Sequence, residues 1–323
     1  LTHASIYRAA SLQRSDFRRR IWYNKKNIRK AQVKAQFYNV FSYIAEKEAD
    51  ELAIKCKAKL VHNTFLEDNY GYGGDMAAQN SYKVIATAHQ PFSWWKFTGK
   101  PVDSLTKLSL LLTLSAFEKE RFEHIIPGKV QSVHHGIDTD FYHADIPINT
   151  RPFRILFVGS WLRDLNMLET VSSNLLNASN EILIDIVYPA IPDINNPIFH
   201  LCKYERVSIH RKLSDEALRD LYNQSRILFL PLKDGTINNA LLEAAACGVP
   251  VVTAPIESIK EYTSDSFTFF YRNSDDCTEY ILNTLFDDKL LSQQSAAARN
   301  HVAYNYSLQQ VAKEHIAVYK SLL

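Results

Sequence analysis

The sequence is poor in cysteine and has no long apolar run, and each shortage excludes a class of protein. Its four cysteines lie far apart and form no Cys-x-x-Cys pair, so they predict neither a disulfide framework nor a zinc site and favour a reducing cytosol. The strongest apolar run, residues 108–114, is interrupted by Ser109 and Thr113 and is much shorter than the roughly 20 residues that span a bilayer. We expect no transmembrane helix, no signal peptide and a cytoplasmic location.

The chain also lacks a strong excess of either charge. Its formal net charge is +2 and its pI is about 8.2. Nucleic-acid binding needs a concentrated basic face, so we expect no nucleic-acid partner. One stretch, residues 14–34, does concentrate lysine and arginine among aromatic side chains. It is either a solvated helix face or a patch for an acidic acceptor or the inner membrane surface, which would make a peripheral membrane contact.

Glycine is scarce as well, so the positions of the nine glycines carry information. Gly136, Gly159, Gly235 and Gly248 each fall beside the end of an expected strand, where an open α/β sheet places its ligand crevice. The glycines of residues 70–75 form a second cluster, which we predict to be a mobile loop or turn. Their spacing does not match a dinucleotide-binding fingerprint.

Short apolar, β-branched runs alternate with helix-like segments, which is typical of parallel sheets covered by helices on both faces. We therefore predict an α/β fold. The expected strands are residues 60–62, 84–87, 110–113 and 130–133 in the first half, and 154–158, 182–187, 207–210, 227–230, 249–253 and 267–271 in the second. Long helices are expected at residues 31–57 and 117–126, and an amphipathic helix at 308–323.

The length of 323 residues exceeds that of one typical domain, roughly 100 to 200 residues, so we expect two domains. Residues 144–152 contain prolines and no strong periodicity, which is typical of a linker. The predicted domains are 1–146 and 153–305, followed by a C-terminal helix at 306–323 that packs back on the first domain. Leu1 is interpreted as the stub of a missing first strand, because a doubly wound domain normally begins with a full strand.

The most informative segment is residues 230–253. It predicts a strand, a polar loop, a helix that begins at Asn238 or Asn239, a stop at Gly248 and a second strand. The free backbone N–H groups at a helix N-terminus favour an anion such as a phosphate. Asn238 can also cap this helix.

Glu243 lies about one turn into the same helix, where its carboxylate could accept hydrogen bonds from vicinal hydroxyls such as those of a ribose. A lone carboxylate on a helix is usually solvated. Here the neighbouring residues are apolar, and a charge among them needs a partner. The pattern therefore favours ligand binding by Glu243.

Together these segments resemble the family-4 retaining glycosyltransferases, whose GT-B fold consists of two Rossmann-like domains that face each other across a cleft. Residues 241–252 (LLEAAACGVPVV) are similar to the family's donor-site helix and the strand after it, and this match is the most specific. The other similar segments are 114–121 (LSAFEKER), 136–142 (GIDTDFY), 155–159 (ILFVG) and 213–222 (LSDEALRDLY). The resemblance covers roughly residues 84–323.

The resemblance implies glycan biosynthesis: transfer of a sugar, with retention, from a nucleotide-diphosphate sugar (UDP or GDP) to a glycan, lipid-linked or small-molecule acceptor. It also implies that Glu243 binds the ribose and that a basic residue after Gly159 meets the diphosphate. Two positions depart from the family pattern. Gly235, with Asp234 beside it, stands where a first glutamate is usual, and Ser160 stands where an arginine is usual.

Arg163 could supply the missing charge, because a guanidinium forks onto two phosphate oxygens. The alternative is a surface ion pair with Asp164. The departures indicate either an inactive relative or a divergent subgroup, and we favour the subgroup because the Asn238–Asn239 pair keeps polar groups in the loop. The predicted donor-binding residues are Gly159, Ser160, Arg163, Asp234, Gly235, Asn238, Asn239 and Glu243.

The first domain offers candidates at the ends of expected strands. His89 is followed by Trp94 and Trp95; stacked aromatic rings are typical sugar platforms, and the histidine could touch the donor sugar or an acceptor phosphate. A lone histidine is more often structural, but its place at the end of a strand favours a functional interpretation about equally. His62 and Glu67 end the neighbouring strand and are weaker acceptor-side candidates. We assign catalytic roles to His89 and Glu243. The residues assigned to the acceptor side are His62, Glu67, Trp94 and Trp95.

The matched segments contain no evident nucleophile, so we expect front-face attack by the acceptor hydroxyl rather than a covalent sugar intermediate. No metal motif stands out, so we expect no metal and no other cofactor. Two rival functions remain open. One is another GT-B enzyme such as a sugar-nucleotide epimerase, which would convert the donor without an acceptor. The other is a non-catalytic nucleotide-sugar or glycan-binding module, which would bind a nucleotide and transfer nothing.

Overall fold

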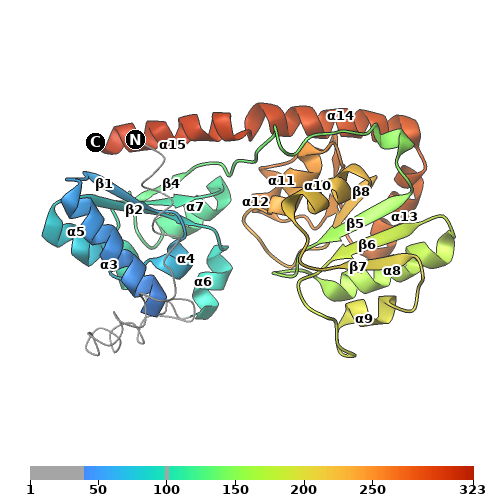
Figure 1. Ribbon diagram of the computed structural model, residues 1–323, viewed down its shortest axis with the longest axis horizontal. Coiled ribbons are helices and arrows are strands. Elements are labelled where there is room, and N and C mark those ends of the chain that lie inside the picture. The colour runs from blue at the N-terminus through green and yellow to red at the C-terminus, as the bar shows by residue number, and fades with distance from the viewer. Residues whose placement is uncertain (1–39, 99–101) are drawn as a thin grey trace. The chain divides into compact units, whose positions relative to one another are not determined.

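The computed structural model describes residues 40–98 and 102–323, which Figure 1 draws in colour. The chain divides into two compact units. Unit 1 contains the described residues up to Val133 together with His315–Leu323, and unit 2 is His134–Glu314. The basic stretch at 14–34, the strand stub expected at Leu1 and the start of the helix expected at 31–57 lie outside the described residues.

Unit 1 is built on a parallel sheet with the strand order β1-β2-β3-β4. Its strands are β1 (Leu60–Asn63), β2 (Lys83–Ala88), β3 (Leu110–Thr113) and β4 (Val130–Ser132), where the apolar runs predict them. Its helices are α3 (Val40–Lys55), α4 (Leu66–Asn69), α5 (Gly73–Asn80), α6 (Phe92–Thr98), the 3-10 helix η2 (Val102–Lys107) and α7 (Ala116–Glu123). All residues of β2 after the first are buried, because a central parallel strand is covered on both faces.

The glycine-rich segment 70–75 is not entirely the loop that the sequence predicts, since α5 begins inside it at Gly73. The buried carboxylate of Glu46 on α3 accepts hydrogen bonds from the backbone N–H groups of Gly71, Tyr72 and Gly73, at 2.8–3.2 Å. A helix start leaves such N–H groups without intrahelical partners. A carboxylate from a distant helix therefore supplies the cap that the local sequence lacks.

Unit 2 is built on a larger parallel sheet with the strand order β10-β9-β8-β5-β6-β7. Its strands are β5 (Arg154–Val158), β6 (Leu183–Val187), β7 (Val207–His210), β8 (Ile227–Leu230), β9 (Val251–Thr253) and β10 (Thr268–Phe270). Its helices are the 3-10 helix η3 (Ile148–Thr150), α8 (Leu165–Ala178), α9 (Pro197–Leu201), α10 (Asp215–Asn223), α11 (Asn239–Ala246), α12 (Glu257–Lys260), α13 (Ser274–Leu285), α14 (Asp288–Asn305) and most of α15 (Leu308–Leu322).

The strand order of unit 2 reverses between β5 and β8. From β5 the chain proceeds outward to β6 and β7, and from β8 it proceeds the other way to β9 and β10. In open parallel sheets such a reversal opens a crevice outside the carboxyl ends of the two central strands, and ligands bind there. The topology alone thus selects the loops that follow β5 and β8.

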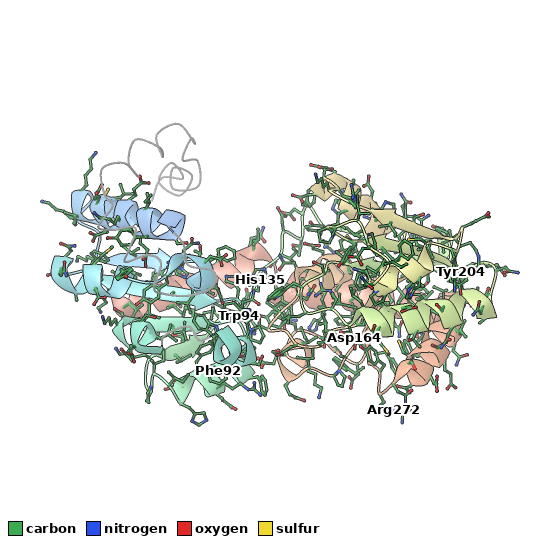
Figure 2. All side chains as sticks on the ribbon, turned by 90° about the horizontal axis from the view of Figure 1, so that it is seen from below. Phe92, Trp94, His135, Asp164, Tyr204 and Arg272 are labelled. Atoms are coloured by element: carbon green, nitrogen blue, oxygen red, sulfur yellow. The ribbon has the colours of Figure 1, made fainter. Side chains whose placement is uncertain are left out.

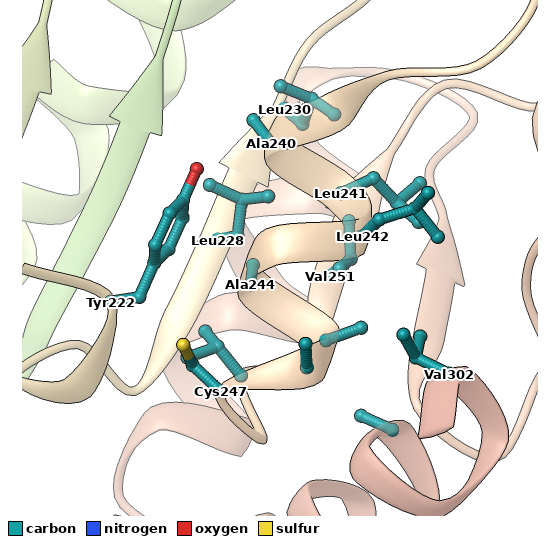
Figure 3. Close-up of a cluster of buried hydrophobic side chains, with 14 of the residues drawn as sticks. Tyr222, Leu228, Leu230, Ala240, Leu241, Leu242, Ala244, Cys247, Val251 and Val302 are labelled. Atoms are coloured by element: carbon teal, nitrogen blue, oxygen red, sulfur yellow. The ribbon is translucent and has the colours of Figure 1, made fainter. Parts of the chain in front are cut away.

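Alternate residues of these two strands face two separate cores. Leu156, Leu228 and Leu230 pack on one face of the sheet with α11, and Phe157 and Phe229 pack on the other face with α8 and α13. Figure 3 shows the first core, in which the buried face of α11 lies against β8 and β9. Because α11 is so well packed, its first residues are fixed with respect to the strand ends.

The two units divide earlier than the linker predicted at residues 144–152. Residues 134–146 group with unit 2, where Arg299 on α14 donates to the carbonyl oxygens of Thr139 and Tyr142, at 2.9 and 2.8 Å. Proline and polar residues mark a segment without regular structure, but distant contacts decide on which unit the segment packs. The compact units therefore divide before the predicted linker, and the predicted domain bounds stay a prediction.

Helix α15 is present where the amphipathic pattern predicts it. Its last residues, from His315 onward, group with unit 1. There the Tyr319 hydroxyl contacts Nδ1 of His62 at 2.7 Å, and Lys83 Nζ donates to the carbonyl oxygen of Leu322 at 2.6 Å. Among the described residues, no helix is long and apolar enough to cross a membrane.

Candidate functional site

The loops that follow β5 and β8 are joined by backbone hydrogen bonds. The N–H group of Asp164 donates to the carbonyl oxygen of Pro231, and that of Lys233 donates to Leu162, both at 2.9 Å. Arg163 and Leu232 form an antiparallel bridge between them. The candidates Gly159, Ser160 and Arg163 are therefore brought beside Asp234 and Gly235, at the switch point of the sheet.

Gly159 leaves the space that the Arg163 guanidinium occupies. Its φ of +93° lies in the left-handed region, and an added Cβ would stand 2.8 Å from Nη2 of Arg163. The guanidinium donates from Nε to the carbonyl oxygen of Val158 at 3.0 Å, and from Nη1 to that of Trp161 at 2.8 Å. This side chain is therefore held over the end of β5.

The alternative of an ion pair between Arg163 and Asp164 is not realised. Asp164, labelled in Figure 2, accepts a hydrogen bond from the N–H group of Met167 at 3.1 Å and so caps α8. In the described part of the chain no carboxylate pairs with Arg163. Burial lowers the pKa of Arg163 to about 10, with a smaller opposing effect of the Tyr222 hydroxyl, so the guanidinium stays cationic at neutral pH and is positioned to attract an anion.

Replacing Gly159 by alanine is expected to destabilise the protein by about 1 to 2 kcal/mol, because it adds a left-handed non-glycine residue and a clash with Arg163. Gly235→Ala is the matched control in the adjoining loop, since its added Cβ would meet nothing closer than 4.0 Å. Urea unfolding followed by circular dichroism measures both variants. Equal stability of the two would contradict the packing of Arg163 over Gly159.

The N-terminus of α11 adjoins these loops. Asn238 caps the helix as predicted, with its Oδ1 accepting from the N–H group of Ala240 at 3.0 Å, and Asn239 is exposed. Asp234 Oδ1 accepts from the N–H group of Gly235 at 2.8 Å. The hydroxyl of the buried Ser258, on α12, donates to the Gly235 carbonyl oxygen, so the polar loop is tied to the next strand–helix connection.

Glu243 lies on the side of α11 that faces α10 and is half-buried. Its Oε2 accepts a hydrogen bond from the Tyr222 hydroxyl at 2.8 Å, and the Tyr142 ring meets the Tyr222 ring edge to face, with the centroids 6.3 Å apart. Burial raises the pKa of Glu243, and both tyrosine hydroxyls oppose that rise. The partner that a charge among apolar residues requires is therefore present, as the phenolic hydroxyl of Tyr222.

The arrangement in unit 2 can hold an anion and a polyhydroxyl group together. The guanidinium of Arg163 and the N–H groups at the start of α11 offer positive charge and donors at the switch point. Glu243 offers acceptors one turn further along α11. Tyr222 interacts with both groups: its hydroxyl donates a hydrogen bond to Glu243 and interacts electrostatically with Arg163.

In unit 1, His89 directly follows β2, at the carboxyl end of the strand. Its Nε2 donates to the carbonyl oxygen of Thr64 at 2.8 Å, and its ring stacks on that of Phe65 with the centroids 4.4 Å apart. Burial lowers the pKa of His89, so the ring is neutral at neutral pH. The imidazole is oriented by its surroundings, and its catalytic role stays a prediction.

Glu67 makes structural contacts, and its predicted acceptor-side role stays a prediction. This side chain is only 4% exposed, and its Oε1 accepts from the backbone N–H groups of His89 and Gln90 at 2.6 and 2.7 Å. A buried carboxylate that binds two backbone N–H groups fixes their segment. Glu67 therefore positions the chain around His89.

His62 is likewise engaged inside unit 1. Its Nδ1 contacts the Tyr319 hydroxyl at 2.7 Å, and its Nε2 contacts Oγ1 of Thr87 at 2.8 Å. Burial, followed by the neighbouring His315 and His89, lowers the pKa of His62 to about 4. A neutral imidazole whose two nitrogens both have contacts joins α15 to the sheet. The predicted acceptor contact of His62 stays a prediction.

The two tryptophans do not form the stacked platform that the sequence predicts. Trp95 is 6% exposed and packs in the core of unit 1, with its ring edge-on to that of Phe122 at 6.0 Å. Trp94 is half-buried, and its ring plane is inclined by 77° to that of Trp95. Trp95 thus contributes to stability, and the acceptor-side roles of Trp94 and Trp95 stay predictions.

Sequence reasoning missed three residues of the site in unit 2. Tyr142 and Tyr222 lie inside two of the segments that resemble the family, but a tyrosine within an apolar pattern indicates a core residue. Lys233 is exposed and pairs with no carboxylate in the described residues, which leaves a second cation beside Arg163. Its position next to Asp234, directly after an apolar strand, was the available signal.

Within the described residues, no group of three or more potential ligand side chains could hold a metal.

The two parallel sheets and the switch-point site of unit 2 define the class of fold, which is GT-B. The chain superposes on sucrose-phosphate synthase from Thermosynechococcus elongatus with a TM-score of 0.70 and 13% identity, over 86% of this chain and 77% of that one. It superposes on Anabaena HepE in complex with UDP and glucose with a TM-score of 0.69 and 13% identity, over 86% and 81% of the chains. It superposes on a glycosyltransferase from Rickettsia africae with a TM-score of 0.65 and 18% identity, over 86% of this chain and 80% of that one.

The sequence itself is similar to one described family. A family model described as glycosyl transferase-like matches residues 168–317, which include α10, β8 and α11. No curated protein matches the sequence. The matched segment holds Tyr222, Asn238, Asn239 and Glu243, and ends before the last residues of α15.

Proposed function

We propose that this protein is a glycosyltransferase that transfers a sugar from a nucleotide-diphosphate sugar to an acceptor with retention, as a divergent member of the family-4 type. One observation carries the proposal: the guanidinium of Arg163, which pairs with no carboxylate of the described residues, lies at the switch point beside the N-terminus of α11, with Glu243 one turn further along that helix. Cation, helix start and carboxylate match the diphosphate and ribose of such a donor.

UDP is the nucleotide that we propose first. HepE, a solved structure with the same fold, is in complex with UDP-glucose and with UDP. Arg163 and the N–H groups at Asn238 and Asn239 would bind the diphosphate and stabilise the negative charge that grows on it as the sugar departs. Glu243 would accept hydrogen bonds from the ribose hydroxyls.

For the transfer itself we propose front-face attack by the acceptor hydroxyl without a metal. A double displacement would need a nucleophilic carboxylate near the sugar carbon. Asp234 is the nearest acidic candidate in the loop after β8, and its Oδ1 is engaged with the N–H group of Gly235. His89, with its neutral and oriented ring, is the proposed unit 1 contact for the sugar or the acceptor.

The acceptor that we propose is a glycan or a lipid-linked sugar. Trp94 supports this choice, since a half-buried indole beside a strand end can carry a sugar ring. TarM, a further structure with the same fold, is in complex with a glycan and UDP, and this chain covers 59% of it. Residues 14–34 would bring the protein to an anionic membrane surface if the acceptor is lipid-linked.

A thermal-shift screen over UDP, GDP, ADP and UDP-glucose tests the proposal. A ligand at 100 times its Kd stabilises the folded protein by about 2.7 kcal/mol, so we expect a rise in melting temperature with UDP and UDP-glucose. No rise with any nucleotide would overturn the proposal. Product analysis with UDP-glucose then separates the rivals: conversion without an acceptor indicates an epimerase, and nuclear magnetic resonance of the transferred sugar reports whether its anomeric configuration is retained.

A further inference from the structure

Unit 2 has a surface hollow to which no residue of the donor site contributes. The hollow lies along the last turns of α14, the helix that packs on α11 (Figure 1), and has a volume of about 670 Å³. Its lining residues all come from this helix: Asn300, His301, Ala303, Tyr304 and Asn305. We infer that this hollow is a second saccharide site, which binds an uncharged sugar ring of a glycan. Binding there needs no nucleotide, so it lies beyond the proposed function.

The buried face of α14 determines which of its residues point outward. Val302 is fully buried against α11, in the core that Figure 3 shows. Asn300 and Tyr304 stand two positions before and two positions after Val302 in the same helix, and side chains two positions apart on a helix point in nearly opposite directions. Both are exposed. Residues four apart are neighbours on a helix surface, so Asn300 and Tyr304 share one outward face.

Tyr304 supplies a surface on which a sugar ring can stack. This residue is 81% exposed, the highest value among the large exposed apolar residues of the described chain. One face of a pyranose consists of apolar C–H groups, and an aromatic ring with a polar tip binds such a face and a neighbouring hydroxyl together. The small side chain of Ala303 leaves space beside the ring, so a ligand can enter the hollow as well as lie over it.

Two side-chain amides at the hollow can bind sugar hydroxyls. Asn305 donates from Nδ2 to the carbonyl oxygen of His301 at 2.8 Å, which fixes the orientation of its amide. The amide of Asn300 is exposed. An amide has an acceptor oxygen and two N–H donors, and a hydroxyl both donates and accepts, so the two groups are complementary to a sugar.

The hollow is rigid and carries no charge. The centroid of the His301 ring lies 5.3 Å from that of Phe267 and 5.6 Å from that of Tyr306. Burial lowers the pKa of His301, so its ring is neutral at neutral pH. No lining residue is an acid, a lysine or an arginine, and the guanidinium of the neighbouring Arg299 is bound to backbone carbonyl oxygens. A neutral ligand therefore fits this hollow better than a phosphate or a metal ion.

A second saccharide site would hold a glycan acceptor on the protein between transfers. Linking two binding events in this way raises the effective concentration of the acceptor at the site of transfer. This role rests on the proposed function, whereas the binding of a saccharide at α14 does not.

The test measures the binding of maltotetraose and of tetra-N-acetylchitotetraose to the full chain without nucleotide, by titration with saturation-transfer difference nuclear magnetic resonance. We expect the wild type to bind at least one of them, and Tyr304→Ala to weaken that binding about tenfold, the scale of an aromatic contact. Ala303→Leu fills the hollow and should weaken binding similarly, whereas Tyr304→Phe keeps the ring and should retain most of it. Phe199→Ala, which removes another exposed aromatic ring of unit 2, is the matched control.

Calorimetric titration of the same variants with UDP separates this inference from the proposed function. UDP binding should be equal in all of them, because none of the substituted residues belongs to the donor site. A wild type that binds UDP but neither oligosaccharide overturns the inference alone. Tyr304→Ala and Ala303→Leu variants that are folded by their melting temperatures and keep full oligosaccharide affinity also overturn it, since the sugar then binds elsewhere. Oligosaccharide binding that depends on Tyr304, without any binding of UDP, supports the inference and overturns the proposed function.

Discussion

Replacing Glu243 by glutamine is expected to weaken UDP binding about tenfold to a hundredfold and, at the same time, to raise the melting temperature of the ligand-free protein at neutral pH. The loss of affinity follows from replacing charge-assisted hydrogen bonds to the ribose by weaker neutral ones, a difference of about 1.5 to 3 kcal/mol. Calorimetric titration with UDP measures it. A residue that acts only in packing would show no such opposition between binding and stability.

The gain in stability follows from the pKa of Glu243. Burial raises this pKa above its unfolded value, so between the two values the native state binds more protons than the unfolded state. Stability therefore falls as the pH rises through this window, and the cost of the buried charge is complete above the folded pKa. Glutamine carries no charge and avoids this cost, so its advantage should be largest at neutral pH and should shrink as the pH is lowered.

Glu181→Gln is the matched control for this variant. Glu181 is an exposed glutamate of the same unit, so its replacement removes the same charge without touching the site and should change neither affinity nor the pH dependence of stability. Melting curves from pH 4 to 8 make the comparison. Unchanged UDP binding in Glu243→Gln would remove Glu243 from the ribose site, and a lower melting temperature at pH 7 would show that the hydrogen bond from Tyr222 outweighs the cost of burial.

Replacing Arg163 by alanine is expected to weaken the binding of UDP more than that of uridine, by about 1.5 to 3 kcal/mol, or roughly 10- to 150-fold. The guanidinium stands over the end of β5 without a carboxylate partner in the described chain, so a diphosphate would be its first counter-ion. Uridine carries no phosphate and reports any general disturbance of the loop. Calorimetric titrations of both ligands give the difference.

The control for this variant is Arg272→Ala. Arg272, labelled in Figure 2, pairs with Asp276 on the surface at the start of α13 and is 82% exposed. Its removal lowers the net charge of the protein equally but should leave both ligands unaffected. If the affinities for UDP and uridine fall by the same factor in Arg163→Ala, Arg163 does not bind the phosphate. The exposed Lys233 of the neighbouring loop is then the candidate, and the same two titrations on Lys233→Ala test it.

Local sequence signals were sufficient for the elements of the fold. All the predicted strands are present because parallel strands buried on both faces require continuous apolar runs, which few other structures produce. The start of α11 was predicted for a similar reason: Asn238 caps it through contacts only two residues away. Signals of this kind are complete within a few residues, so no knowledge of the fold is needed to interpret them.

The contacts that the sequence did not predict share a different property, which is that their partners are distant in the sequence. Glu46, which caps α5, is 25 residues from Gly71 in the sequence, and His62 is 257 residues from its partner Tyr319. Trp94 and Trp95 are adjacent and chemically identical, yet only one enters the core. Neighbouring residues of a helix point in directions about 100° apart, and the tertiary packing decides which direction is inward.

The sequence by itself determined the α/β class, the positions of the strands, the cap of α11 and the presence of a carboxylate one turn into that helix, because each depends on periodicity or on contacts within one turn. Only the tertiary structure decided that Arg163 is free of Asp164, that Tyr222 holds Glu243, and that residues 134–146 pack on unit 2. Burial and hydrogen bonding between distant segments set these features, and neither is encoded in the spacing of neighbouring residues.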